Sequence, residues 1–261
     1  MGKRGIVHRD RGVALLIVLL VTALLIALIF EFAYGTRVSL RGAVNFRDSQ
    51  RAYFLARSGV AIFTKFSELK DSVPQGEWGV VPIISTGDTE VRFKWEDERG
   101  KFNINDVNSA LGLTQSGVGL LFSQWQVSMA VLDQVKELRI SAPFKLLTEL
   151  RKVMSDEDYN KVAKFLTVSS DNKININTAS EDVLNSVLNN NKVAVGMIVN
   201  NRKNKPIGSL DEVGLTQTNT VPNIFANLVT TNGTLMVYSY ATVGGYTKQI
   251  ESIGSTYWSV K

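Results

Sequence analysis

The feature that most constrains this chain is an uncharged apolar run at residues 13–30, with the sequence VALLIVLLVTALLIALIF. As an α-helix, at about 1.5 Å per residue, such a run is roughly 27 Å long, close to the hydrocarbon thickness of a bilayer. A secretory signal peptide has a shorter apolar stretch followed by a small-residue cleavage site, whereas this run ends in Phe30, Glu31 and Phe32. The sequence therefore predicts one membrane-spanning helix that is retained in the protein.

Basic residues before the run predict its orientation. Lys3, Arg4, Arg9 and Arg11 precede the span, and short basic flanks favour the cytoplasmic side of a membrane. We therefore expect a cytoplasmic N-terminus, with the rest of the chain on the opposite side.

Helical spacing continues beyond the apolar run. Apolar or small residues recur at three and four residues through the following segment: Ala52, Leu55, Ala56, Gly59, Ile62, Phe63 and Phe66. The first proline is Pro74. We expect one helix over residues 13–70, with its second half amphipathic and docked on a globular head. Gly35 and Gly42 are the points at which this helix would bend most easily.

Composition argues against most kinds of enzyme. The chain has no cysteine, and its single histidine is His8, so zinc sites, thiol nucleophiles and disulfides are not expected. Loss of the first twelve residues would leave no histidine and therefore no Ser-His-Asp arrangement. Phosphate-binding loops, dinucleotide fingerprints and nucleophile elbows are also missing from the sequence. We expect a protein that is not an enzyme, with no catalytic residue and no metal ligand set.

The net charge gives little support for a nucleic-acid partner. The chain carries a formal charge of +5, of which residues 1–12 supply +3. A head that is nearly neutral lacks the excess of cations that binding to phosphates requires.

Strands are predicted on both sides of a long helical region. After a loop rich in Gly and Pro at residues 71–88, residues 89–96 alternate apolar and charged side chains. The same style returns at residues 235–243 and 246–253, which flank Gly244 and Gly245 as in a tight hairpin. Residues 256–260 would add a short strand. We expect a small antiparallel sheet built from residues 71–100 and 231–261.

Residues 101–230, between these strands, have a helical texture and contain a degenerate repeat. The string KFNIND at residues 101–106 is echoed by KININT at residues 173–178, and Pro143-Phe144 is echoed by Pro206-Ile207. The expected fold class is α+β, with a long N-terminal helix and a sheet interrupted by an inserted α-helical domain. Two related modules, at about residues 101–170 and 171–230, make up the insert.

Acidic residues in the insert are interpreted as helix starts. Thr178 with Glu181, and Ser155 with Asp158, have the spacing of capping boxes. The cluster at residues 156–158 is interpreted in the same way rather than as a cation site. The acids of the segment at residues 96–98 are expected in a turn at the end of a strand.

The N-terminal junction resembles that of a type IV prepilin. A short basic peptide ends in Gly12 and the hydrophobic stem follows at once, in the order Arg11-Gly12-Val13-Ala14-Leu15-Leu16. The resemblance implies a leader at residues 1–12 that a prepilin peptidase removes, followed by methylation of the new amino group of Val13. It also implies assembly through stem residues Val13, Leu16, Ile17, Leu20 and Leu24.

One departure narrows this resemblance. Most pilins carry glutamate at the fifth mature position, which here is Ile17. In lacking this glutamate and in carrying the ININTASEDVL string, the sequence resembles the minor pseudopilin K family of type II secretion systems. That resemblance implies a non-enzymatic subunit at the pseudopilus tip that supports its assembly and protein export. It also implies a single-pass inner-membrane protein with a periplasmic head.

The same resemblance implies partners and raises the question of calcium. The implied partners are other minor pseudopilins, the prepilin peptidase and the inner-membrane secretion platform. Members of the family carry an acidic stretch in the middle of the α-domain, of which residues 129–142 keep only Asp133 and Glu137. The resemblance makes calcium a possible ligand, but calcium needs six or more oxygen ligands and the sequence offers no convincing set. We therefore expect no cofactor.

Two other interpretations stay open. The ININTASEDVL string also resembles the helix-hairpin-helix fold of DNA-binding proteins, which would make the chain a membrane-tethered DNA receptor. In that fold a glycine pair in the hairpin approaches phosphate, but residues 189–192 here read NNNK. Arg202, Lys203 and Lys205 could still contact phosphate, although a solvated helix end is the simpler interpretation. A minor pilin of a type IV pilus is the third interpretation, and genomic neighbours would distinguish it from the first.

Overall fold

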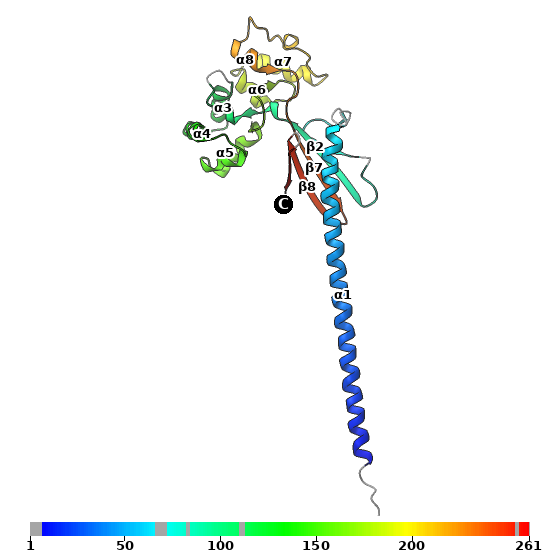
Figure 1. Cartoon of the computed structure of the whole chain (residues 1–261). Helices are drawn as coiled ribbons and strands as arrows, with labels where there is room; N and C mark the ends of the chain where they lie inside the picture. The colour runs from blue at the N-terminus through cyan, green and yellow to red at the C-terminus, as the bar shows by residue number, and fades with distance from the viewer. Residues whose placement is uncertain (1–6, 66–71, 82–83, 110–112, 254–255, 261) are drawn as a thin grey trace, which may run out of the picture.

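The computed structural model describes residues 7–65, 72–81, 84–109, 113–253 and 256–260. The small antiparallel sheet lies alongside the C-terminal third of the long helix, and the helical lobe lies next to the sheet (Figure 1). The lobe lies beside the C-terminal end of the helix and extends beyond it, at the opposite end of the molecule from the N-terminus. The predicted α+β class, with a long N-terminal helix and a small antiparallel sheet, is confirmed.

The helix α1 spans Val7–Lys65 and passes through Gly35 and Gly42 without interruption. It begins before Val13, and residues 66–70 of the predicted helix lie outside the described part of the chain. The single polar side chain of the apolar run, Thr22, donates its hydroxyl to the carbonyl oxygen of Val18 at 2.9 Å. This bond satisfies the hydroxyl within the helix, as an apolar solvent requires.

The last third of α1 docks on the sheet through small and apolar residues. Ala52, Ala56, Val60 and Phe63 are buried, against sheet residues that include Phe93. Gly59 brings the two backbones close: a Cβ at this position would lie 2.3 Å from Oγ of Ser239. The expected amphipathic, docked second half of the helix is therefore present.

The sheet has the strand order β1-β2-β7-β8-β9, and all four pairings are antiparallel. Its strands are β1 (Gly79–Val80), β2 (Thr89–Asp97), β7 (Leu235–Val243), β8 (Tyr246–Ile253) and β9 (Thr256–Val260). Gly244 and Gly245 form the predicted turn between β7 and β8 with φ of 54° and 84°, a conformation that favours glycine. The chain leaves the sheet after β2 and returns at β7, so the lobe is an insertion between neighbouring strands.

The lobe consists of short helices in two successive groups. The first group contains β3 (Phe102–Asn103), α3 (Leu113–Gln124), α4 (Met129–Ser141), the 3-10 helix η3 (Leu147–Lys152), α5 (Asp156–Val162) and β4 (Leu166–Thr167). The second group contains β5 (Ile174–Asn175), α6 (Glu181–Val187), α7 (Lys192–Arg202), the 3-10 helix η5 (Leu210–Val213), α8 (Pro222–Asn227) and β6 (Leu228–Val229). Three further 3-10 segments are η1 (Glu98–Gly100), η2 (Ile104–Asp106) and η4 (Ala163–Phe165).

The sequence repeat corresponds to a repeat of contacts. In the first group Asn105 accepts from the amide of Phe144 at 2.7 Å and donates to the carbonyl of the same residue at 3.0 Å. In the second group Asn177 accepts from the amide of Ile207 at 2.8 Å and donates to its carbonyl at 3.0 Å. The echoed asparagines thus hold the echoed Pro-x segments.

Two further features repeat. β3 pairs in parallel with β4, and β5 pairs in parallel with β6. Arg139, in the last turn of α4, donates to the carbonyl of Asn105 at 2.8 Å, and Arg202, at the end of α7, donates to the carbonyl of Ile176 at 2.9 Å. The two groups are therefore related modules that use the same internal supports.

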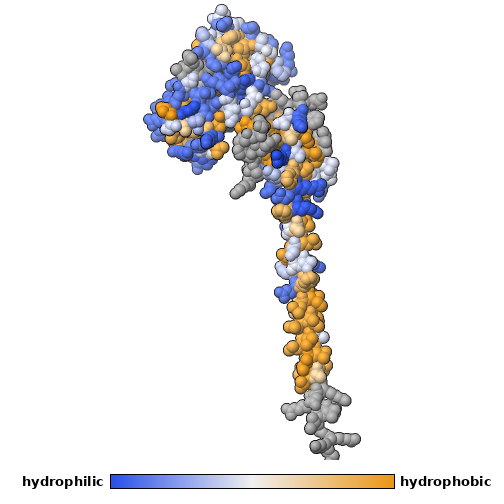
Figure 2. Space-filling model, viewed as in Figure 1, coloured by the Kyte–Doolittle hydropathy of each residue, from blue (hydrophilic) through white to orange (hydrophobic). Residues whose placement is uncertain are grey.

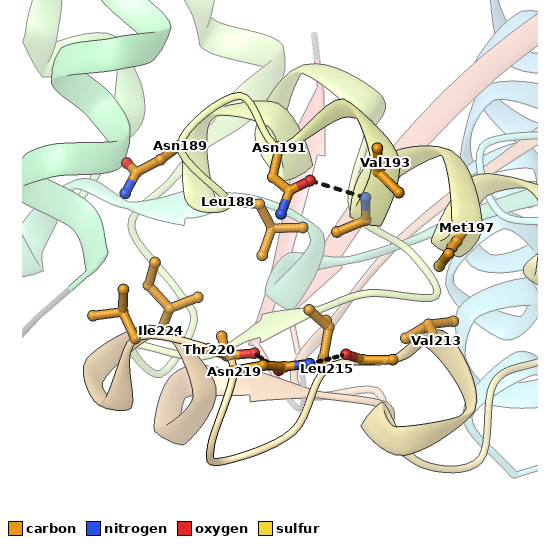
Figure 3. Close-up of a pocket in the computed structure, with 13 residues that line it drawn as sticks. Leu188, Asn189, Asn191, Val193, Met197, Val213, Leu215, Asn219, Thr220 and Ile224 are labelled. Atoms are coloured by element: carbon orange, nitrogen blue, oxygen red, sulfur yellow. Dashed lines mark hydrogen bonds between the residues drawn. The ribbon is translucent and has the colours of Figure 1, made fainter.

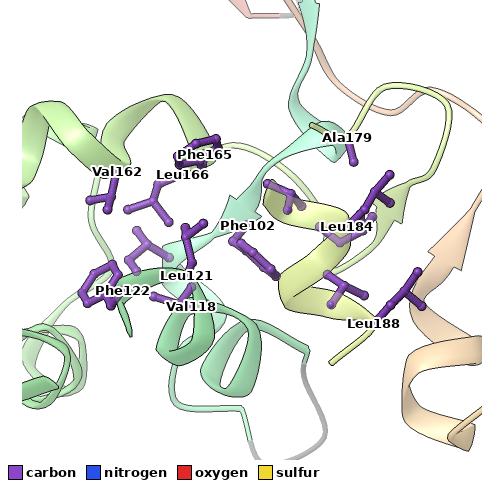
Figure 4. Close-up of a cluster of buried hydrophobic side chains, with 14 of the residues drawn as sticks. Phe102, Val118, Leu121, Phe122, Val162, Phe165, Leu166, Ala179, Leu184 and Leu188 are labelled. Atoms are coloured by element: carbon purple, nitrogen blue, oxygen red, sulfur yellow. The ribbon is translucent and has the colours of Figure 1, made fainter. Parts of the chain in front are cut away.

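One apolar core joins the two modules. The Phe102 ring lies between α3 of the first module and α6 of the second (Figure 4). Gly117 in α3 makes room for this ring, because a Cβ there would lie 2.4 Å from a ring carbon of Phe102. The packing of one module on the other makes the lobe a single unit.

The helix starts match the sequence in one case and differ in the other. Ser155 caps α5 by accepting from the amide of Asp158 at 3.1 Å. The predicted pair of Thr178 and Glu181 is wrong: Ser180 caps α6, and the Thr178 hydroxyl donates to Asp97 instead. Thr178 is used for a contact with the sheet, and the cap moves two residues on.

Candidate assembly surface and its support in the head

The membrane half of α1, residues 13–32, is exposed along its whole length, and its run at residues 13–30 is apolar on every side (Figure 2). Among the described residues, α1 is the helix long and apolar enough to cross a membrane. A helix that is hydrophobic on every side is stable where lipid or other apolar helices surround it. The exposed surface is therefore a candidate for contact with lipid and with other stems.

The predicted stem residues share one stripe of this surface. Their relative exposures are 54% for Val13, 68% for Leu16, 57% for Ile17, 69% for Leu20 and 58% for Leu24. Spacings of three and four residues place them on the same face of the helix. The five residues share one face of α1, and none packs against the described part of the head.

Gly12, the predicted cleavage position, lies inside α1 one residue before this stripe. A Cβ at Gly12 would have nothing within 4 Å among the described residues. Apart from proline, glycine is the least favourable residue in a helix interior, and it costs about 1 kcal/mol relative to alanine. Gly12 therefore weakens the helix locally, as Gly35 and Gly42 do further along α1.

A buried carboxylate anchors the lobe to the sheet. Asp97, at the end of β2, is 0% exposed. Its Oδ1 accepts from the amides of Arg99 at 3.2 Å and Gly233 at 3.0 Å, and its Oδ2 accepts from Asn175 at 2.8 Å and Thr178 at 2.9 Å. Four donors compensate the cost of burying the charge. Arg99 lies where the chain leaves the sheet, Gly233 lies where it returns, and Asn175 and Thr178 belong to the second module. Asp97 therefore fixes the lobe to the sheet at the point where the two chain segments join it.

Arg99 adds a second tie at the same place. Its guanidinium forms two bonds with Asp171, at 2.8 and 2.6 Å, and donates to the carbonyls of Thr231 and Asn232, both at 3.2 Å. The hydrogen bond from Arg99 lowers the pKa of the Asp171 carboxyl. The side chain thus joins the outgoing chain, the link between the modules and the returning chain.

A third tie links the sheet to the first module. The ammonium of Lys101 lies 2.8 Å from Glu96 and 2.9 Å from Glu98, and Thr167 donates to Glu98. Burial alone would lower the pKa of Lys101, but the charges of Glu98 and Glu96 outweigh burial and raise it. Burial alone would raise the pKa of Glu96, but the attraction and hydrogen bonds of Lys101 and Lys94 lower it. The paired charges of Lys101 and Glu96 therefore stabilise each other at this junction.

These ties were not predicted from the sequence, which placed residues 96–98 in a turn. Glu98 is 3% exposed, so both it and Asp97 are buried acids. A signal was present for Asp97: the alternation that places Val91, Phe93 and Trp95 on the inner face continues to position 97.

The residues of the DNA-receptor interpretation are largely committed to internal contacts. Arg202 donates to the carbonyls of Ile176 and Ala179 at 2.9 and 2.6 Å, so it is neither a solvated end nor a free phosphate ligand. In the hairpin, the amides of Asn190 and Asn191 donate to the carbonyls of Asn185 and Leu188 at 2.7 and 3.0 Å. Lys203 and Lys205 are exposed.

The acidic side chains in α4 and at the start of α5 form ion pairs with neighbouring cationic side chains. Within the described ranges, no group of three or more acidic or histidine side chains could hold a metal ion. The acids at the start of α5 pair with neighbours: Asp156 with Arg151 at 2.8 Å, and Glu157 with Lys161 at 2.8 Å. Asp133 pairs with Lys136 at 3.3 Å.

Comparison with known proteins finds a relative by structure. No family model matches the sequence, and no curated protein matches it. Among solved structures the chain is similar to GspK, in the crystal structure of the GspK-GspI-GspJ complex from the type 2 secretion system of enterotoxigenic Escherichia coli. The TM-score is 0.63 at 12% sequence identity, and the match covers 84% of this chain and 99% of that one. The chain therefore has a pilin fold of the minor pseudopilin K type.

Proposed function

We propose that this chain, with its pilin fold of the minor pseudopilin K type, is a non-enzymatic minor pseudopilin that helps to start or cap the pseudopilus of a type II secretion system. In this role it supports the export of proteins across the outer membrane. Residues 13–70 form the stem, residues 71–100 and 231–261 the pilin sheet, and residues 101–230 the inserted lobe. The protein crosses the inner membrane once, with a cytoplasmic N-terminus and a periplasmic head.

The observation that carries the proposal is the exposed stripe from Val13 to Leu24, which is not covered by any described part of its own chain. A stem already in lipid gains little from burial of apolar area alone, so close packing must supply specificity. The stripe contains no carboxylate, and Ile17 stands where most pilins carry glutamate. In a pilin that glutamate would neutralise the terminal ammonium of a neighbouring subunit. A subunit with none ahead of it has no such charge to neutralise.

The position of the lobe supports a place at the tip. The lobe lies beside the end of α1 that is farthest from the membrane half and extends beyond it (Figure 1), and the ties of Asp97 and Arg99 hold it there. Its bulk would stand above the stem and obstruct a further subunit. Partners would then join from the side and below, as other minor pseudopilins of a heteromeric tip complex.

Processing precedes assembly in this proposal. The prepilin peptidase cuts after Gly12, and the amino group of Val13 is methylated. The inner-membrane secretion platform then receives the mature stem. The protein's own chemistry is limited to binding, because no catalytic group is proposed and no cofactor is needed.

Single-cysteine cross-linking tests the assembly role. The chain has no cysteine, so Leu16→Cys introduces a unique thiol on the stripe. We expect this variant to form a disulfide in membranes with a minor pseudopilin that carries one cysteine in its own stem. Ser58→Cys, on the exposed side of the docked half, is the matched control and should give little product.

Two outcomes would replace the proposal. Equal cross-linking from both positions would show that the stripe is not the assembly surface. Retention of duplex DNA by the detergent-solubilised protein at 150 mM salt, lost on replacement of Lys203 and Lys205, would favour the DNA-receptor interpretation.

A further inference from the structure

The second module has an open groove at the far end of the head. The groove has a volume of about 520 Å³ and lies between α7 on one side and the η5–α8 segment on the other (Figure 3). Its floor includes the buried side chains of Leu188, Leu215 and Ile224. Three exposed apolar side chains form its rim: Val193 at 69%, Met197 at 48% and Val221 at 56%.

The lining is uncharged. The described residues along the groove are apolar, or they are asparagine, threonine and glycine. Asn191 and Asn219 are held by local bonds, to the amides of Ala194 at 3.2 Å and Thr216 at 2.8 Å. A pocket that offers apolar walls and neutral amides favours a neutral, largely apolar group over a charged one.

The first module has a different side chain at the equivalent position of its helix link. The link between α3 and α4 corresponds to the link between α6 and α7, and each contains a residue with positive φ, Gln126 at 57° and Asn189 at 50°. The residue before it is Trp125 in the first module and Leu188 in the second. The Trp125 ring packs against Phe165 with centroids 5.5 Å apart. The first module thus supplies its own aromatic ring where the second has a shorter side chain and an open groove.

From this internal comparison we propose that the groove of the second module binds one uncharged aromatic side chain, presented by a segment of another protein. The partner's ring would occupy the space that an indole occupies in the first module. Val193, Met197 and Val221 would close around it. This inference does not depend on the proposed role in secretion.

Ligand-observed fluorine NMR tests the proposal. The full chain is placed in lipid nanodiscs, and the probe is N-acetyl-5-fluorotryptophan amide, with empty nanodiscs as the baseline. We expect the probe's signal to broaden with the protein. A benzophenone analogue, N-acetyl-4-benzoylphenylalanine amide, should label residues 188–197 or 213–224 on irradiation.

Two variants should weaken binding in different ways. Leu188→Trp copies the first module and fills the groove from within. Val193→Lys adds a charge at an exposed rim position, where folding is not at risk, and should weaken binding about tenfold or more. Ala130→Lys, at the equivalent exposed position of the first module, should leave binding unchanged.

Several results would overturn the proposal. Equal broadening with Val193→Lys and with Ala130→Lys would place the probe elsewhere. Displacement of the probe by a dodecyl-chain detergent but not by N-acetyltryptophan amide would identify a lipid site. Concentration-dependent self-association that Val193→Lys abolishes would make the groove a contact between copies of this chain.

Discussion

The two halves of α1 belong to one continuous helix but solve different problems. In the membrane half, residues 13–32, side chains are exposed on every side and the run at residues 13–30 has no ionisable group. In the docked half, around residues 52–63, one face is buried on the sheet and the other, which includes Phe54, Arg57 and Ser58, is exposed. One helix therefore carries both a surface that is buried within its own chain and a surface that is left exposed.

The difference shows where each half obtains its stability. The docked half is supported by its own head, through small residues such as Ala52, Ala56 and Gly59 that allow close approach. The membrane half has no packing partner among the described residues of its own chain. Substitutions should accordingly affect folding in the docked half and assembly in the membrane half.

The largest expected effect is that of a charge in the stripe. Leu20→Arg, made together with the Leu16→Cys reporter, places a guanidinium near the middle of the span. Such a charge costs about 3 kcal/mol at the centre of a transmembrane helix. The other uncharged residues of the run keep the helix in the membrane, so cross-linking to a partner stem should fall by tenfold or more while the head stays folded.

Ser58→Arg is the control for this substitution in the docked half. Ser58 is exposed and faces away from the sheet, so the change should alter stability by no more than about 0.5 kcal/mol. Equal losses of cross-linking in the two variants would remove the distinction between the halves.

A smaller effect is expected from Gly59→Val. Even the Cβ would lie 2.3 Å from Oγ of Ser239 and 3.0 Å from a methyl carbon of Val91. Overpacking of this kind costs about 1–3 kcal/mol, so the head should unfold at a lower temperature in circular dichroism. Gly35→Val, at a helical glycine with open space around it, should not lower that temperature. Similar losses for both would mean that helix propensity, not docking, controls the effect.

The smallest expected effect is a loss of stability at acidic pH, and it should be confined to the head. The carboxyl pKa values of Asp171 and Glu96 are lowered in the folded protein. A lowered pKa stabilises the fold above the unfolded value of about 4, and this contribution is lost as the pH falls below it. Because Asp171 is partly exposed, its share is about 1 kcal/mol or less.

Thermal unfolding of the head between pH 7 and pH 3 measures this effect. The midpoint should fall on the acid side, and Asp171→Asn should reduce the dependence on pH. Membrane insertion should not change with pH, since the apolar run has no group to titrate. A steeper acid response in the asparagine variant would contradict the assignment of the Arg99–Asp171 tie.

Periodicity made much of this fold predictable. The apolar run, the alternation at residues 89–96 and the glycine pair at residues 244–245 each indicate one structure strongly, because burial on one face imposes a fixed period. The repeat of Asn105 and Asn177 was visible as a string, although its meaning as paired contacts was not.

What could not be predicted depends on contacts between distant segments. Asp97 and Glu98 look like turn acids until Asn175, Thr178 and Gly233 are brought to them across the chain. Thr178 has the spacing of a cap but is used by the sheet. Arg202 looks like a solvated cation but satisfies two carbonyls. In each case a long-range partner overrides the local pattern.

The central claim is that the membrane half is retained as a joining element after its basic leader is removed. The most direct test is the intact mass of the protein extracted from membranes of cells with active prepilin peptidase. We expect a chain that begins at Val13 and carries one added methyl group, and Gly12→Leu should leave the leader attached. An unmodified N-terminus at Met1 or Gly2, or a product that begins after Phe30, would contradict the account.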